Sequence, residues 1–407
     1  MAIHVVGGFY EERCTRPAWS ETFGSGGRAA AAIATYGSEV IFHTYASPKS
    51  QSYLQMFAGA YKLYAQPSSI ARAVAFSYLH DLADPHIAHV PPTQSMAAPL
   101  QIQQDNVVRF GMLEGDAIVQ AQWAVYDPQN QGAPVPFGAN GSSAKHLALV
   151  LNSREAQQMA GLPQGDAQAC ARKIAQEQHA EVVIIKQGAQ GALVWANQQA
   201  TQVPAYRTQN VWKIGSGDCF VAYFAQAWME QQLAPAVAAD FASRATAYYV
   251  DTKGFTTPQT LEAAHYTPIH PTSGQLSTKP KKVYLAGPFF HLGQIWLIEQ
   301  ARTLLQSTGL HVISPFHDIG LGTAEDVVPL DIQAIEECDL VFAAADGLDP
   351  GTIFELGYAR SLDKPVVIYS ETQVGTESLK MMQGTGCEIY ANFTTAIYAA
   401  RWRAVES

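Results

Sequence analysis

The stretch Lys213-Ile214-Gly215-Ser216-Gly217-Asp218-Cys219-Phe220 carries the clearest chemical signal in the first half of the chain. Gly215 and Gly217 let the backbone bend closely and point N–H groups at one spot, where the following helix adds the positive end of its dipole. An anion is stabilised at such a place, and Asp218 is suited to take a proton from a hydroxyl group that attacks a phosphate. The same residues are also compatible with an ordinary helix N-terminus, in which Asp218 is only a first-turn carboxylate.

Around this stretch, short β-branched runs alternate with alanine-rich helical patterns. The sequence predicts strands at 4–6, 181–185, 283–286, 340–344 and 365–369, and helices at 28–36, 218–231, 294–307 and 351–362. This rhythm indicates an α/β protein whose parallel sheets are covered by helices on both faces, with sites beyond the carboxyl ends of the strands. Residues 94–106 are rich in Gln and Pro, and we expect a surface excursion there.

The composition limits the classes of protein. A chain of 407 residues is long enough for two or three domains, and 48% hydrophobic residues can form large cores. The formal net charge of −10 argues against nucleic acid or an anionic membrane as the main partner. The five cysteines form no CxxC pair, and the N-terminus shows no charged leader. We therefore expect a cytoplasmic protein without a disulfide framework or a structural zinc.

One segment, His265 to Lys282, combines Pro, Ser, Thr, Gly and a small basic run with almost no apolar periodicity. A new strand pattern begins directly after it. The sequence therefore predicts one domain over residues 1–265, a linker over 266–282 and a second domain over 283–407.

The second domain has its own chemical stretch, DPGTIFELGYA, which follows the strand at 340–344. Asp349 is a good N-cap and Pro350 a good first residue of a helix. Glu355 has no such structural explanation, because its neighbours Ile353, Phe354 and Leu356 are apolar. A partly desolvated carboxylate of this kind is a candidate functional group.

On these motifs, most of residues 1–265 resemble the ribokinase or PfkB family of sugar and nucleoside kinases. The resemblance implies a ribokinase-like three-layer α/β domain that uses ATP and Mg²⁺. In that resemblance Asp218 takes the position of the catalytic base, and Gly215, Ser216 and Gly217 form the rest of its glycine motif. The strand-turn at 186–192 leads into the ATP site, through Lys186, Gly188 and Gly191. Asn152 and Glu155 match a motif that organises magnesium through water, without a direct metal ligand. Gly26 and Gly27 resemble the glycine pair near the substrate sugar.

The departures from the family pattern fall on the substrate side. Trp212 stands where the family has Asp, and Ala31 where an Asn is expected. Glu12, with Glu11 beside it, replaces the sugar-binding Asp. Two interpretations of the first domain therefore stay open: an active kinase, or a ligand-binding or structural relic.

Residues 282–370 resemble the nucleoside 2-deoxyribosyltransferase family, on the motifs at 284–290, 331–339, 349–359 and 364–366. The resemblance implies a smaller flavodoxin- or Rossmann-like doubly wound parallel sheet that needs no cofactor. It makes Glu355 the nucleophile that attacks C1′ of a nucleoside, with Tyr284 close to it. Asp349 would help to bind the sugar and Asp331 would lie near the base, while the first loop brings Gly287, Phe289 and Phe290 to the substrate. We expect one of the two phenylalanines to stack on the base and the other to belong to the core.

The chemistry agrees with these residue types. Cleavage of an N-glycosidic bond passes through an oxocarbenium-like state that a carboxylate near C1′ can trap, as in retaining glycosidases. A second carboxyl group with a raised pKa can protonate the departing base. The loop GPFFHLG lacks Arg, so a free nucleoside is a better expected substrate than a 5′-monophosphate.

The family often completes its site with a polar side chain from a neighbouring subunit. Ser378 and Asn392 are the candidates here, and we expect a homo-oligomer. The resulting hypothesis is a bifunctional enzyme of nucleoside metabolism that cleaves or transfers a nucleoside through Glu355 and phosphorylates a nucleoside or sugar through Asp218. In the alternative, the kinase-like domain is catalytically silent and serves as a nucleotide sensor or dimerisation module. Hydrolysis and base exchange are both compatible with the sequence.

Overall fold

The computed structural model describes residues 2–129, 132–270, 280–320, 322–372 and 375–406. The chain folds into two compact units, one of Met1–Thr208 with Trp212–Thr267 and one of Gln209–Val211 with Pro268–Ser407. Residues 271–279 of the predicted linker lie outside the described residues. The division at residue 265 and the linker 266–282 stay predictions.

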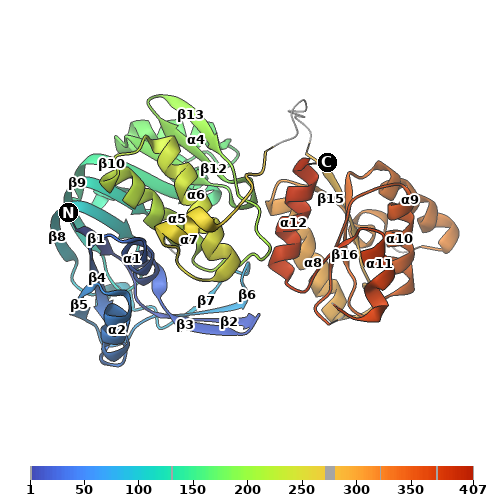
Figure 1. The fold of residues 1–407 in the computed structure, drawn as a ribbon, viewed down its shortest axis with the longest axis horizontal. Helices are drawn as coiled ribbons and strands as arrows, with labels where there is room; N and C mark the ends of the chain where they lie inside the picture. Colours follow the sequence, from blue (N-terminus) through green and yellow to red (C-terminus); the bar gives the residue numbers. More distant parts are fainter. Residues whose placement is uncertain (1, 130–131, 271–279, 321, 373–374, 407) are drawn as a thin grey trace. The chain divides into compact units, whose positions relative to one another are not determined.

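The first unit contains a nine-stranded sheet in the order β13-β12-β11-β10-β9-β8-β1-β4-β5 (Figure 1). Its strands are β1 (Ile3–Val6), β4 (Val40–Ala46), β5 (Tyr64–Ser69), β8 (Leu100–Phe110), β9 (Ala117–Asp127), β10 (Ser143–Asn152), β11 (Val182–Lys186), β12 (Ala192–Ala196) and β13 (Gln199–Val203). The strands from β5 to β11 pair in parallel, whereas β12 and β13 pair antiparallel. The antiparallel edge arises because the turn between β11 and β12 is too short for a crossover connection.

Helices cover both faces of this sheet. Side chains alternate along β11, so that Val182 and Ile184 join one core while Val183 and Ile185 join the other. The first core includes side chains of α1 (Gly24–Tyr36), α2 (Pro48–Tyr61), α5 (Ser216–Ala225), α6 (Pro235–Thr252) and α7 (Pro258–Ala263), and the second includes side chains of α3 (Ser153–Ala160) and α4 (Ala167–Gln178). The three-layer α/β architecture predicted from the sequence is confirmed by this arrangement of one sheet between two layers of helices.

A separate four-stranded sheet, in the order β3-β2-β6-β7, belongs to the same unit. Its strands are β2 (Glu11–Arg16), β3 (Trp19–Thr22), β6 (Ala75–His80) and β7 (His86–Ala88). Strand β2 carries Glu12, whose side chain is buried.

The predicted surface excursion at residues 94–106 is wrong over most of its length. Only Thr93–Ser95 form a short 3₁₀ turn, and β8 begins at Leu100 and runs through the middle of the sheet between β9 and β1. Gln101, Gln103 and Gln104 are exposed while their backbone pairs with β9. A polar composition did not exclude a strand here, because the sheet needs the backbone groups of these residues and leaves their side chains in solvent.

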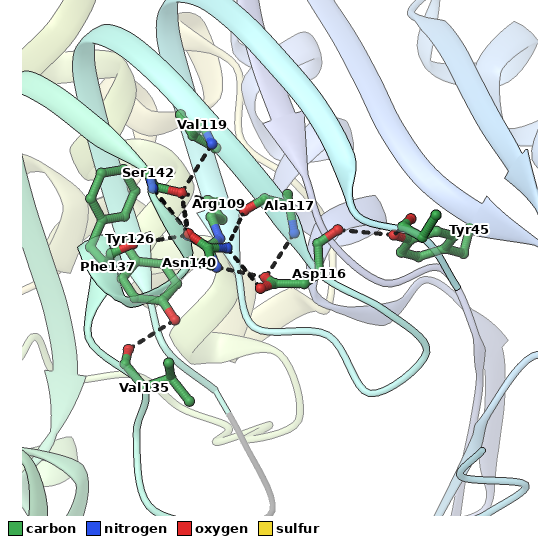
Figure 2. A network of polar contacts seen from close by, with 11 residues as sticks. Tyr45, Arg109, Asp116, Ala117, Val119, Tyr126, Val135, Phe137, Asn140 and Ser142 are labelled. Carbon is green, nitrogen blue, oxygen red and sulfur yellow. Dashed lines mark hydrogen bonds and ion pairs between the residues drawn. The ribbon is translucent and has the colours of Figure 1, made fainter. Parts of the chain in front are cut away.

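A polar network holds the loops that follow β8 and β9 (Figure 2). The buried Arg109 donates from Nη2 to Asp116 Oδ1 over 2.7 Å and from Nη1 to Ser142 Oγ over 3.1 Å. Its guanidinium lies over the rings of Tyr126 and Phe137, 4.7 and 5.6 Å from the centroids. Arg109 is therefore a buried cation with a structural role, and it can be compared with Arg28, which is also buried in this unit.

The second unit contains a five-stranded sheet, all parallel, in the order β15-β14-β16-β17-β18. Its elements are β14 (Lys282–Ala286), α8 (Leu292–Ser307), β15 (His311–Ile313), α9 (Ala324–Glu337), β16 (Leu340–Ala344), α10 (Pro350–Ser361), β17 (Val366–Tyr369), α11 (Lys380–Gly384), β18 (Glu388–Tyr390) and α12 (Phe393–Glu406). Helices α9, α10 and α11 pack on one face, and α8 and α12 contact the strands from the other. The doubly wound parallel sheet is therefore as predicted.

This strand order reverses direction between β14 and β16. Ligands of doubly wound sheets bind at such a switch point, in the crevice beyond the carboxyl ends of the strands. The loops after Ala286 and after Ala344 begin at this place; the first carries Gly287, Phe289 and Phe290, and the second leads to Asp349. In the part of the chain that the structure describes, none of the helices has the length and apolar character needed to cross a membrane.

Candidate functional site

The site of the second unit is built around a contact between β14 and α10. The Tyr284 hydroxyl donates a hydrogen bond of 2.6 Å to Glu355 Oε1. Burial raises the pKa of Glu355 to about 7, the hydrogen bond from Tyr284 opposes this, and the charges of Asp331 and Asp349 add to it. The pKa of Tyr284 is raised by burial and by Glu355 and Asp331, so its hydroxyl stays protonated and able to donate.

Asp331, from α9, and Asp349, at the start of α10, complete this acidic group. Asp331 lies on α9, burial raises its pKa, and its Oδ1 has no hydrogen-bond partner among the described residues. Asp349 caps α10, because its Oδ2 accepts from Thr352 N over 2.8 Å and from Thr352 Oγ1 over 3.0 Å. The structure thus brings together the four residues predicted for the reaction centre.

The predicted first loop combines tight packing with an exposed ring. Gly287 has a φ of +155°, and a Cβ there would lie 2.8 Å from Ile298 Cδ1, so close helix packing requires glycine. Phe289 is half-buried with its ring centroid 5.3 Å from that of Phe316, whereas Phe290 is 73% exposed. Phe290 is therefore the ring free to meet a ligand, and Phe289 belongs to the packing of the loop.

Of the two residues proposed to act across subunits, Asn392 has a local role. Its Oδ1 accepts from Thr395 N over 2.8 Å and from Thr395 Oγ1 over 2.9 Å at the start of α12. Ser378 lies on an exposed 3₁₀ turn. The proposal that either one completes a neighbouring site stays a prediction.

The site of the first unit lies where β9 and β11 end and α5 begins. Lys186, the last residue of β11, donates over 2.5 Å to Asp127 Oδ2 at the end of β9. Lys213 donates from Nζ to Ser216 Oγ over 2.8 Å. Burial and the nearby charge of Lys186 lower the pKa of Lys213 to about 8. Because a Cβ on Gly217 would lie 3.3 Å from Lys186 Nζ, the start of α5 faces this lysine.

Asp218 has an arrangement that the sequence did not indicate. Its Oδ2 accepts from Arg28 Nη1 over 2.8 Å, and its Oδ1 accepts from Gln129 Nε2 over 2.7 Å. The same Arg28 donates from Nη2 to Glu12 Oε2 over 2.5 Å. Arg28 is 0% exposed, and Glu12 and Asp218 are buried with it. The predicted base and the predicted sugar-binding carboxylate are thus joined by one buried guanidinium.

Several predicted binding glycines have a packing reason for being glycine. A Cβ on Gly26 would lie 2.6 Å from the Gly7 carbonyl carbon, and a Cβ on Gly27 would lie 2.9 Å from the Phe9 ring. Gly188 and Gly191 adopt positive φ angles in the turn between β11 and β12. The close approach of α1 to the loop after β1 accounts for the glycine pair without a ligand.

The predicted magnesium motif forms the start of α3. Asn152 Oδ1 accepts from Glu155 N over 2.9 Å, and Glu155 Oε2 accepts from Asn152 N over 2.8 Å, which is a capping box. Among the described residues, no three His, Cys, Asp or Glu side chains gather closely enough to hold a metal ion. The carboxylate oxygens at this place nevertheless suit a hydrated cation. The charge of Glu155 reaches Asp127, and Asp127 Oδ1 is a buried oxygen without a hydrogen-bond partner in the described part of the chain.

Four residues of this site were missed from the sequence: Arg28, Asp127, Gln129 and Lys213. A signal existed for Arg28, because a single cation inside the run of small and apolar residues from Gly24 to Ile33 must find a counter-ion. Asp127 directly follows the apolar end of a strand. Two of the departures from the family pattern are buried: Ala31 is in the core, and the Trp212 ring centroid lies 5.0 Å from that of Trp19 and 4.1 Å from Lys253 Nζ.

Two family models match this chain, one in the region of each unit. Residues 143–262 match the model of the pfkB family of carbohydrate kinases, and residues 283–388 match the model of nucleoside 2-deoxyribosyltransferases. The chain therefore carries a kinase-family region followed by a deoxyribosyltransferase-family region, in the order predicted. A search of curated proteins found no match.

Solved structures resemble the first unit in fold. Aminoimidazole riboside kinase from Salmonella enterica, solved with aminoimidazole riboside and an ATP analogue, is 14% identical, with a TM-score of 0.51 over 65% of this chain and 99% of that chain. A fructokinase double mutant from Vibrio cholerae O395, solved with fructose, ADP and potassium, is also 14% identical, with a TM-score of 0.50 over 64% of this chain and 97% of that chain. At these identities the likeness shows the ribokinase fold.

Proposed function

We propose that the second unit cleaves the N-glycosidic bond of a nucleoside through Glu355, with release of the base and formation of a glycosyl ester on the carboxylate. The observation that carries the proposal is the 2.6 Å hydrogen bond from Tyr284 to Glu355 in an otherwise acidic group at the strand switch point. Tyr284 holds one oxygen of Glu355, which leaves the other free to attack C1′. Asp331, with its raised pKa and its unpartnered Oδ1, is placed to protonate or orient the departing base.

The electrostatics favour a neutral substrate. The charged groups that shift the pKa of Glu355 are Asp331 and Asp349, both acidic. A nucleoside 5′-phosphate would bring a further negative charge to this group, whereas an uncharged nucleoside would not. The exposed ring of Phe290 offers a face on which a base can stack.

A product assay with a trap tests this proposal. The full chain is incubated without ATP with a panel of ribo- and 2′-deoxynucleosides and their 5′-monophosphates, and release of the base is followed by mass spectrometry. Addition of a second free base distinguishes transfer from hydrolysis. A 2′-fluoro-2′-deoxynucleoside should slow breakdown of the intermediate, so that the peptide containing Glu355 gains the mass of the fluorinated sugar. An adduct on another peptide, or base release only from monophosphates, would contradict the proposal.

For the first unit we propose nucleotide binding, with the phosphates held at the start of α5 by Lys186 and Lys213. The match to the pfkB family covers these residues, and the two lysines, the helix N-terminus and the acidic pair Asp127 and Glu155 suit ATP with a hydrated Mg²⁺. When bound, ATP would supply the phosphoryl group. Calorimetry of the full chain with ATP and MgCl₂ tests this, and Lys213→Met should weaken the affinity by about 10-fold.

Phosphoryl transfer through Asp218 was the sequence prediction for this unit, and a silent nucleotide-binding module was the alternative. The contacts of Asp218 favour the alternative. A general base must accept a hydrogen bond from the hydroxyl it deprotonates, and an incoming hydroxyl would have to share an Asp218 oxygen with Arg28 or Gln129.

A further inference from the structure

The buried triad of Arg28, Glu12 and Asp218 is the feature of the first unit that the proposed function does not use. Arg28 lies near the start of α1, Glu12 on β2 and Asp218 in the first turn of α5, so one guanidinium joins three elements. Side-chain exposure in the two ion pairs is 1% for Arg28, 3% for Glu12 and 9% for Asp218. Buried charges of this kind are stable only when each has its partner.

The surroundings of Arg28 fix it in this place. A Cβ on Gly215 would lie 2.1 Å from Arg28 Nε, so the guanidinium packs directly against the glycine of the anion motif. The Phe23 ring centroid lies 5.3 Å from Arg28 Cζ. Glu12 is held as well, because Gly24 N donates to its Oε2 over 3.2 Å. The positive φ of Gly215, +78°, together with this packing, explains the glycine without a phosphate.

A neighbouring cavity stops short of Asp218. It has a volume of about 820 Å³, and its wall includes Phe9, Tyr10, Phe23 and Tyr61. Neither Glu12, Arg28 nor Asp218 is part of this wall as far as the described residues form it. Tyr10 also belongs to this wall, and burial together with the charges of Glu12 and Asp218 raises the pKa of its hydroxyl. The wall of this cavity thus approaches the triad through Tyr10 and does not include the Asp218 carboxylate itself.

We propose that Arg28 occupies the place of the acceptor hydroxyl and makes Asp218 a structural counter-ion, so that the first unit holds nucleotide phosphates without transferring them. This inference rests on the proposed nucleotide binding only for the ligand. The phosphate side uses Lys186, Lys213 and the Gly217 backbone, which the triad leaves unengaged. On the acceptor side the guanidinium donates to one Asp218 oxygen and Gln129 donates to the other, so a hydroxyl would compete with a buried ion pair for this carboxylate.

Thermodynamic coupling tests the structural half of this proposal in the full chain. Asp218→Asn should lower the melting temperature of the first unit by several degrees, and most of this loss should vanish in an Arg28→Met background, because the two residues then no longer share a charge pair. Arg109→Met is the matched control: it removes the other buried arginine of the unit, and its effect should add to that of Asp218→Asn. The control also identifies which melting transition belongs to this unit.

The triple variant Glu12→Gln, Arg28→Met, Asp218→Asn keeps the test decisive if single variants do not fold. Removal of all three charges should restore a folded unit, since replacing a whole buried ion cluster is often neutral or stabilising. Additive effects of Asp218→Asn and Arg28→Met, or a triple variant that is no more stable than Asp218→Asn alone, would overturn the counter-ion role.

Phosphoryl transfer is measured separately, with ATP, MgCl₂ and a panel of nucleosides and sugars, by ³¹P NMR. We expect ATP binding with no phosphorylated product from the wild-type chain, and unchanged ATP affinity in Asp218→Asn. Transfer to an acceptor that falls 100-fold or more in Asp218→Asn would overturn the inference and make Asp218 a catalytic base. Absence of ATP binding would contradict the proposed nucleotide site alone, and the coupling experiment would still decide the role of Arg28.

Discussion

Asp218 and Glu355 are carboxylates at similar positions in the fold. Their neighbours differ in charge, because Asp218 pairs with a cation and Glu355 lies among other acids. Each lies in the first part of a helix that begins beyond the carboxyl ends of parallel strands. Asp218 meets the guanidinium of Arg28, whereas Glu355 meets the hydroxyl of Tyr284 and the charges of Asp331 and Asp349. A motif places a carboxylate at a sheet edge, but the partners that reach it from elsewhere decide whether it stabilises the fold or reacts.

The difference has a direct physical basis. A buried carboxylate with a cationic partner contributes to the fold, and its removal leaves an uncompensated charge. A half-buried carboxylate among other acids is destabilised in its ionised form, as the pKa of about 7 for Glu355 indicates. Groups of the second kind are typical of reaction centres. Four predictions make this comparison sharper or break it.

The largest effect is expected from Glu355→Gln. Base release should fall by about 10³-fold or more, because an amide cannot form the glycosyl ester. The free energy of unfolding at pH 8 should rise by about 1–2 kcal/mol, since the variant removes a carboxylate that is ionised at an energetic cost. Both are measured on one preparation, by product analysis and by urea titration. Glu336→Gln, which changes an exposed side chain of α9, is the control and should change neither the rate of base release nor the free energy of unfolding.

The second prediction concerns the pH dependence of base release by the wild-type chain. Glu355 attacks only when ionised, and its pKa is about 7, so the rate should rise with pH and level off above neutrality. Below the pKa, the rate should fall about 10-fold per pH unit, or about 100-fold over two units. A rate that stays constant down to about pH 5 would mean that Glu355 is not the titrating group.

Tyr284→Phe should have a smaller effect on the same profile. The hydrogen bond from Tyr284 stabilises the ionised form of Glu355, so its loss should raise the pKa of Glu355 and move the pH profile to higher pH by about one unit. At neutral pH the rate should drop about 5-fold, because the ionised fraction of Glu355 falls by that factor. Tyr358→Phe is the matched control, because Tyr358 donates over 2.7 Å to Glu336 on the surface. An unshifted profile in Tyr284→Phe would show that this hydrogen bond does not tune the nucleophile.

The smallest effect is an opposite response of the two units to acid. His4 Nδ1 and His43 Nε2 lie 2.9 Å apart in the first unit, and burial, together with the charge of His4, lowers the pKa of His43 from 6.5 to about 4. The stability from this neutral pair is present above pH 6.5 and is lost as the pH falls toward about 4.

On acidification, the free energy of unfolding of the first unit should therefore fall by about 1–2 kcal/mol less in His43→Gln than in the wild-type chain. His146→Gln, which removes an exposed histidine paired with Glu181, should leave that loss unchanged. Protonation of Glu355 stabilises the second unit over a similar range, because its folded pKa of about 7 lies above the usual 4.5. Urea titrations at several pH values measure both responses. The Arg109→Met variant, which changes the first unit, identifies which unfolding transition belongs to that unit.

Local sequence was enough for the features that depend on neighbouring residues. The strand at 340–344 and the start of α10 were predicted closely, because a short buried apolar run and the Asp-Pro pair act within a few residues. The capping box of Asn152 and Glu155 is equally local. The Gln-rich start of β8 was missed because its strand state depends on pairing with β9, which the sequence of the segment does not contain.

The sequence by itself determined the two α/β units, their family resemblances and the places of Asp218 and Glu355 along the chain. Tertiary structure alone decided their partners. Arg28 and Asp218 are 190 residues apart, and Tyr284 and Glu355 are 71 apart. The environment of a carboxylate is set by the few groups within about 4–6 Å of it, and in a parallel sheet those groups come from strands and helices that are distant in sequence.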